Sequence, residues 1–141
     1  MRRAILHAVM AYSAVIPLKE LVARSELIVV ATVFGLRVEG SQSIAMADVE
    51  DVWKGSVAGH TVEYVASPGW FACDVSSARK GERVVLFLER NPSDRRLSIA
   101  HYGRGRMEIV KDAVRAYEVP LPTTDLATLE RVVTETKRPP R

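Results

Sequence analysis

The chain has 141 residues, of which 48% are hydrophobic and 26% charged, and its formal net charge at pH 7 is +3. These values predict one globular domain and exclude a second, because a chain of this length buries about two thirds of its unfolded surface in a single core. The lone Cys73 excludes a fold held together by internal disulfides.

The first residues have features of an export leader. Arg2 and Arg3 precede a short apolar stretch that ends near Ala14, which suits the apolar region of a secretory signal and is too short to span a membrane. His7 interrupts this stretch, so a strand or helix of the mature fold is the alternative reading. We expect residues 1–16 to be a leader or an N-terminal extension. The protein is exported to the periplasm or the outside in the first case and cytoplasmic in the second.

The segment Leu27–Val38 is the centre of the predicted fold. It is rich in β-branched residues and apolar at nearly every position, which is typical of a strand buried on both faces. Before it, Pro17 begins a short amphipathic helix that we expect to pack on the barrel and plug one end of it. Arg83–Glu89 has the same doubly apolar pattern. The two segments therefore predict neighbouring central strands of a closed sheet, that is, a small β-barrel.

Shorter β-rich segments follow the first strand. Ser43–Trp53 changes the phase of its apolar residues, which predicts a β-bulge near Asp48. Further strands are expected at Thr61–Ala66, Leu97–Tyr102, Met107–Val110 and Ala113–Val119, the last two as a hairpin. Asp125 is expected to cap a C-terminal amphipathic helix. We assign residues 17–122 to the barrel domain and residues 123–141 to the C-terminal helix and tail.

Four pieces of sequence occur in a characteristic order. They are Leu-Val-Ala-Arg-Ser-Glu-Leu-Ile-Val-Val-Ala-Thr-Val after a short helix, Val-Glu-Asp-Val-Trp-Lys-Gly, a Pro-Gly loop that holds a cysteine, and Lys-Gly-Glu-Arg-Val-Val-Leu-Phe-Leu. In this order they resemble the netrin-module family, which includes the tissue inhibitors of metalloproteinases and exported bacterial proteins of uncharacterised function. The resemblance covers Leu18 to Val110. It implies a mainly β fold, a five-stranded OB-like Greek-key barrel with flanking helices, and protein binding rather than catalysis.

The resemblance also indicates where a partner would dock. In the inhibitors, a free amino-terminal cysteine chelates the protease zinc beside a loop that leads to a conserved cysteine. The counterpart of that loop here contains Pro68, Gly69, Trp70, Phe71 and Cys73. No cysteine precedes Cys73, so inhibition by zinc chelation is not implied. We expect the two aromatic rings to anchor an unidentified protein partner, and the alternative is that both rings cap the core.

Single-stranded nucleic-acid binding is the alternative function. OB-type barrels bind such strands with a basic groove and stacking aromatics. The most basic stretch of the chain, residues 95–106, supplies Arg95, Arg96, Tyr102, Arg104 and Arg106. However, Asp94, Glu108 and Asp112 lie in or next to this stretch, and the net charge is small. These acidic residues favour a solvated surface, so a nucleic-acid partner is not expected.

Motifs of catalysis are absent from the sequence. It contains no Gly-x-Ser-x-Gly, no phosphate-binding glycine loop and no His-Glu-x-x-His. The three histidines, His7, His60 and His101, are far apart in sequence, which does not favour a metal site. Three carboxylates on one strand, Asp48, Glu50 and Asp51, are expected to be solvated, with a calcium ion as the alternative. We therefore expect neither an enzyme nor a bound metal or cofactor.

Overall fold

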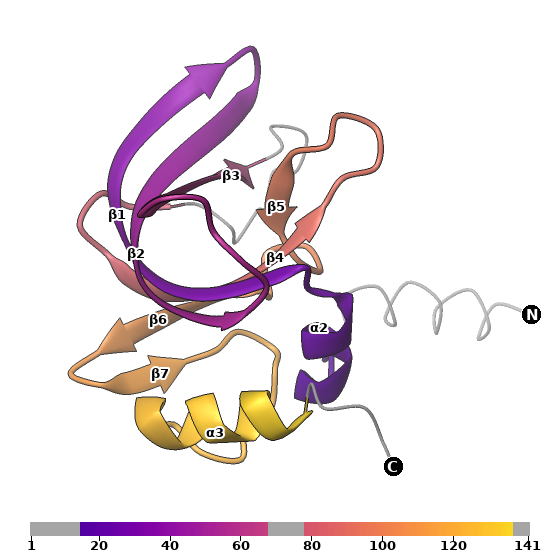
Figure 1. The fold of residues 1–141 in the computed structure, drawn as a ribbon, viewed down its shortest axis with the longest axis vertical. Helices are drawn as coiled ribbons and strands as arrows, with labels where there is room; N and C mark the ends of the chain where they lie inside the picture. The colour runs from indigo at the N-terminus through magenta and orange to yellow at the C-terminus, as the bar shows by residue number, and fades with distance from the viewer. Residues whose placement is uncertain (1–14, 68–77, 137–141) are drawn as a thin grey trace, which may run out of the picture.

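A computed structural model describes residues 15–67 and 78–136 of the chain (Figure 1). The fold is mainly β, with one short helix before the strands and one helix after them. The elements are α2 (Leu18–Arg24), β1 (Leu27–Glu39), β2 (Gln42–Lys54), β3 (Thr61–Ser67), β4 (Arg83–Arg90), β5 (Leu97–Ile99), β6 (Arg106–Val110), β7 (Ala113–Arg115) and α3 (Leu126–Thr136).

Five of the strands close into a barrel. They neighbour one another in the order β1-β2-β3-β5-β4, and β4 pairs with β1 again. The pairs are antiparallel except for β3 and β5, which run parallel where Val65 meets Ser98. β6 and β7 continue the sheet from β4. The predicted five-stranded barrel with a helix at each end of the chain is thus confirmed.

The doubly apolar strands are central because the molecule has a core on each side of them. Leu27, Val29 and Ala31 of β1 face the interior of the barrel, whereas Ile28 and Val30 face a second core outside it. That second core lies between the barrel and the two helices, and it includes residues of α2, β4, β6 and α3. α2 therefore covers the outer face of the strands and does not fill the barrel. Side chains on both faces of β1 and β4 are buried, which explains why neither strand alternates between apolar and polar residues.

One expectation about β1 is wrong for its second half. Burial on both faces holds from Leu27 to Val33, but Phe34, Leu36 and Val38 are exposed. The reason is the length of the strand, since β4 pairs with β1 only as far as Thr32. Beyond that point, within the described residues, β1 pairs with β2 alone, while β2 also pairs with β3, and the β1–β2 hairpin projects at the top of Figure 1.

Irregular pairing bends the β1–β2 ribbon. The register shifts where Trp53, Glu50 and Phe34 have no opposite residue on the other strand. The bulge expected near Asp48 is thus present at Glu50, two residues further along. Each extra residue strengthens the local twist, which lets β1 pair with β4 at one end and leave the barrel at the other. At the end of the fold, Asp125 Oδ2 accepts hydrogen bonds from the Thr128 backbone N–H (3.0 Å) and hydroxyl (2.8 Å), which confirms the predicted helix cap.

Candidate functional site

The loop predicted to dock a partner leaves the barrel beside the projecting hairpin. Pro68, Gly69, Trp70, Phe71 and Cys73 lie outside the described residues. The residue before this loop, Ser67, is described: it is the last residue of β3 and pairs with Ser43 of β2. Ser43 in turn pairs with Val38 of β1. With about 4.8 Å between paired strands, the loop begins roughly 10 Å from Val38.

An exposed apolar face runs along the β1 side of the hairpin. Phe34 is 43% exposed, Leu36 46% and Val38 74%. Leu36 and Val38 are two residues apart, so they lie on one face of the strand. Large apolar side chains gathered in this way, rather than scattered singly, mark a surface that other molecules can cover. Sequence reasoning missed this face, although the alternation of Leu36 and Val38 with Arg37 and Glu39 was a signal for it.

The charged face of the same hairpin is bound to the rest of the barrel. The Arg37 guanidinium donates hydrogen bonds to Glu39 (2.7 Å) and to Glu63 of β3 (2.9 Å). Arg96, in the β4–β5 loop, donates to Glu39 (2.7 Å) and Gln42 (3.4 Å). These arginines lower the pKa of the Glu39 carboxyl, mainly through the hydrogen bond from Arg96. The network holds the hairpin against the β4–β5 loop and leaves the apolar face open.

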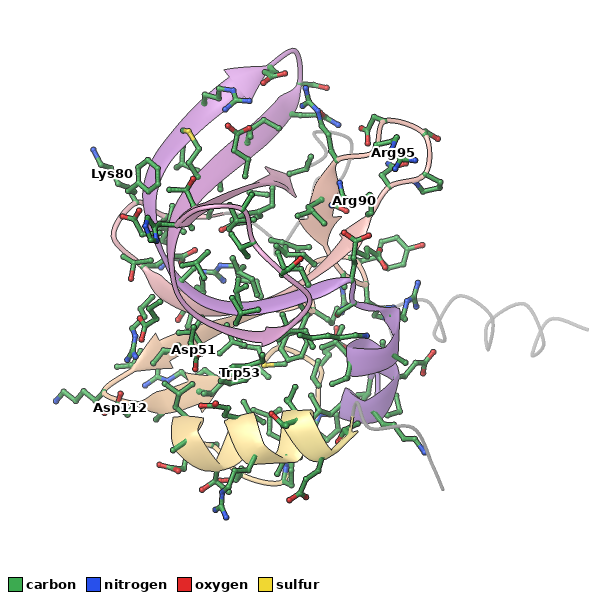
Figure 2. The ribbon with its side chains drawn as sticks, in the orientation of Figure 1. Asp51, Trp53, Lys80, Arg90, Arg95 and Asp112 are labelled. Carbon is green, nitrogen blue, oxygen red and sulfur yellow. The ribbon has the colours of Figure 1, made fainter. Side chains whose placement is uncertain are left out.

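A small pocket lies between the hairpin and the β4–β5 loop. Its volume is about 220 Å³, and it is lined by Arg37, Glu63, Arg90, Arg95 and Arg96 together with apolar residues of β2, β3 and β5. Arg90 donates to Glu26 (2.7 Å) and to the backbone carbonyl of Arg95 (2.6 Å). Figure 2 shows Arg95 in the β4–β5 loop above Arg90. Among the described residues, no carboxylate forms an ion pair with Arg95.

The arginines proposed for nucleic-acid binding do not form one basic groove. Arg95 and Arg96 lie at the pocket, and Arg96 is paired with Glu39. Arg104 is buried, forms an ion pair with Glu118 and lies with its guanidinium carbon 5.0 Å from the centre of the Tyr117 ring. Tyr102, by contrast, is half exposed.

Arg106 belongs to the structure of the barrel rather than to its surface. Its Nε donates to Glu82 (3.0 Å), its Nη2 forms a second bond to the same carboxylate, and Nη2 also donates to Glu108 (3.1 Å). The Arg106 and Glu82 side chains are both only 11% exposed. Nearby, the fully buried Tyr64 hydroxyl has no hydrogen-bond partner among the described residues, and burial raises its pKa.

Two of the three carboxylates considered on β2, Glu50 and Asp51, have structural partners. Glu50 accepts two hydrogen bonds from Arg83 (2.8 and 2.6 Å), and these bonds lower its pKa. Asp51, labelled with Trp53 in Figure 2, accepts from the Trp53 indole N–H (3.2 Å) and the Val52 backbone N–H (2.9 Å). Within residues 15–67 and 78–136, no group of three or more histidine, cysteine or acidic side chains is placed to hold a metal ion.

His101 lies in a turn with unusual backbone geometry. Its φ is 51°, that of Tyr102 is 53° and that of Gly103 is 90°, so three successive residues are left-handed. Arg24 Nη1 lies 3.1 Å from His101 Nδ1. Because an arginine can only donate, this contact requires a neutral imidazole with the proton on Nε2. Burial, followed by the charges of Arg24 and Arg104, lowers the pKa of His101 below its ordinary value of 6.5.

This pKa shift predicts that acid destabilises the fold in a defined pH range. The folded chain binds a proton at His101 less readily than the unfolded chain, so stability is complete above about pH 6.5 and falls as the pH drops below that value. We expect the free energy of unfolding, measured with urea, to fall between pH 7.5 and 5.5, where carboxylates stay ionised. His101→Asn, which tolerates the left-handed backbone, should reduce this fall, whereas His60→Asn on the exposed β2–β3 turn should not. An equal fall in both variants would contradict the assignment.

Neither models of known protein families nor curated protein sequences gave a match to this chain. The two helices in the described part of the chain are not long and apolar enough to cross a membrane.

Proposed function

We propose that this chain is a non-enzymatic protein-interaction module of the netrin or metalloproteinase-inhibitor type, built on an OB-like barrel. Its docking region is the end of the barrel where the β1–β2 hairpin projects and the Pro68–Cys73 loop begins. The observation that carries the proposal is the exposed apolar face of the hairpin, formed by Phe34, Leu36 and Val38. Trp70 and Phe71, in the loop that begins at this end of the barrel, are residue types that often anchor protein interfaces.

The arrangement of charge supports a protein partner over a nucleic acid. A phosphate backbone is bound by basic side chains that are free to replace its counterions. Of the four arginines considered for that role, Arg96, Arg104 and Arg106 already have carboxylate partners. An apolar surface beside a rigid ion-pair network is instead suited to docking that depends on burial and therefore responds weakly to salt.

Site-specific photo-crosslinking in the native host tests the proposal. A benzoylphenylalanine at Val38 should attach a foreign protein, recognised by an adduct whose mass differs from twice the mass of the chain, in low and high salt alike. The adduct should be lost in the Trp70→Ala/Phe71→Ala double variant and absent when the probe replaces Glu130 on α3, at the opposite end of the molecule (Figure 1).

Two further measurements separate this function from the alternatives. Salt-sensitive binding of a fluorescent single-stranded oligonucleotide, weakened by Arg95→Ala, would favour the nucleic-acid function and contradict ours. Export is the second part of the proposal, supported by Arg2, Arg3 and the apolar residues after them. The N-terminal mass of protein purified from its host should show cleavage, and retention of Met1 would contradict export.

A further inference from the structure

The outer edge of the hairpin is an unpaired strand edge. β1 pairs with β4 through Thr32, and the Val33 backbone is bound by Glu82 (2.9 Å) and Gly81 (2.7 Å). From Phe34 to Glu39, β1 pairs with β2 on one side, and no described residue pairs with the other side. An extended edge of this kind can accept a further strand.

Charge gives this edge little protection. Charged side chains discourage a second strand from pairing, but Arg37 and Glu39 are held on one face by Glu63 and Arg96. The other face is apolar and exposed. A strand added to this edge would therefore continue an apolar face without burying an unpaired charge.

We propose that the occupant of this edge is a second copy of the same chain, paired antiparallel to β1 about a two-fold axis at Leu36. This inference rests on the proposed function, because it takes the hairpin as a protein-docking surface. In this register Leu36 faces Leu36 of the second copy, and Phe34 faces Val38 of the second copy. Six apolar side chains then lie together on one face of a continuous sheet to which each copy contributes β1, β2 and β3.

The charges of the edge agree with this register. It sets Arg37 opposite Gly35 of the second copy, so the guanidinium keeps its own carboxylates and meets no like charge. An axis at Arg37 would instead oppose two guanidiniums, which is unfavourable. The paired segment ends before Val33, whose backbone is bound by Glu82 and Gly81, so Glu39 of the second copy comes next to this connection and its Lys80. Lys80 is exposed and lies at the outer edge of β1 in Figure 2, so it supplies the opposite charge.

The proposed interface is small. One strand pair centred on five residues, from Phe34 to Val38, is less than the roughly 1,600 Å² of a standard protein interface. We therefore expect a dimer that dissociates in the micromolar range, and sedimentation of the full chain should show a reversible monomer–dimer equilibrium. Leu36→Arg should remain monomeric at every concentration. Because Leu36 is nearly half exposed, this variant should keep the unfolding midpoint of the parent, which separates loss of the dimer from loss of the fold.

Cysteine crosslinking tests the register itself. In a Cys73→Ser background, Leu36→Cys places two thiols opposite each other, with Cα atoms about 5 Å apart, within disulfide range. Val38→Cys places them about 13 Å apart along the strands, which is too far. We expect Leu36→Cys to form a disulfide-linked dimer at least about ten times faster than Val38→Cys. A mixture of Phe34→Cys and Val38→Cys chains should crosslink to each other.

Each other outcome overturns the inference. A monomer at all concentrations with slow crosslinking at Leu36 removes the second copy, yet it leaves the proposed function to be judged by the foreign adduct at Val38. A dimer that persists in Leu36→Arg uses another surface. A foreign protein crosslinked from position 36, with no self-association, would show that a different partner occupies the edge.

Discussion

Replacing Arg106 by alanine is expected to lower the free energy of unfolding by about 3 kcal/mol. The substitution leaves Glu82 with a buried carboxylate and no cation, because Arg106 supplies both of its side-chain hydrogen bonds and both side chains are 11% exposed. Removing one partner of a buried ion pair costs more than the pair itself contributes. Urea unfolding followed by circular dichroism measures the loss.

Two variants serve as controls for this effect. Arg96→Ala removes an ion pair with Glu39 in which both side chains are more than one third exposed, so its loss of stability should be much smaller than that of Arg106→Ala. The double variant Arg106→Met/Glu82→Leu leaves no unpaired charge between the two positions and should recover much of the loss. If Arg106→Ala were as mild as Arg96→Ala and weakened oligonucleotide binding instead, Arg106 would have the nucleic-acid role that its ion pairs argue against.

The barrel could be predicted because the sequences of its central strands show that both of their faces are buried. An apolar residue at nearly every position of β1 and β4 requires cover on both faces, and the structure supplies a core on each side. The cap at Asp125 was equally local, since donor and acceptor are three residues apart. Features whose cause lies within a few residues are readable from sequence.

The candidate site was less predictable because its causes are distant in sequence. Composition alone makes residues 95–106 basic, but whether each arginine is free depends on carboxylates elsewhere in the chain. Glu39 is 57 residues from Arg96, and Glu82 is 24 from Arg106. In the same way, Phe34 and Leu36 are as apolar as Val29, and only the point where β4 stops pairing exposes them. The exposed face of the hairpin therefore depends on where β4 ends, and its one signal in the sequence is the alternating polarity of residues 36–39.

Replacing Gly105 by alanine is expected to cost at least about 2 kcal/mol, through steric overlap. A Cβ at this position would lie 2.4 Å from the Phe87 carbonyl oxygen and 3.0 Å from the Ala100 nitrogen. Both are backbone atoms in a local hydrogen-bond network, in which Phe87 N–H donates to the Gly105 carbonyl (2.7 Å) and Ala100 N–H donates to the Phe87 carbonyl (2.9 Å). Neither can move without disturbing β4, the strand that closes the barrel.

Gly40→Ala is the matched control, because it measures the cost of an unfavourable backbone conformation without any steric overlap of the added Cβ. Gly40 has a φ of +61° with no atom within 4 Å of an added Cβ, so its replacement pays only the cost of a left-handed alanine, about 1 kcal/mol. Thermal and urea unfolding of both variants should therefore rank Gly105→Ala as the less stable. Equal losses of stability would mean that β4 shifts to accommodate the added methyl group. The close contact between the β5–β6 connection and Phe87 would then not be required for closure of the barrel.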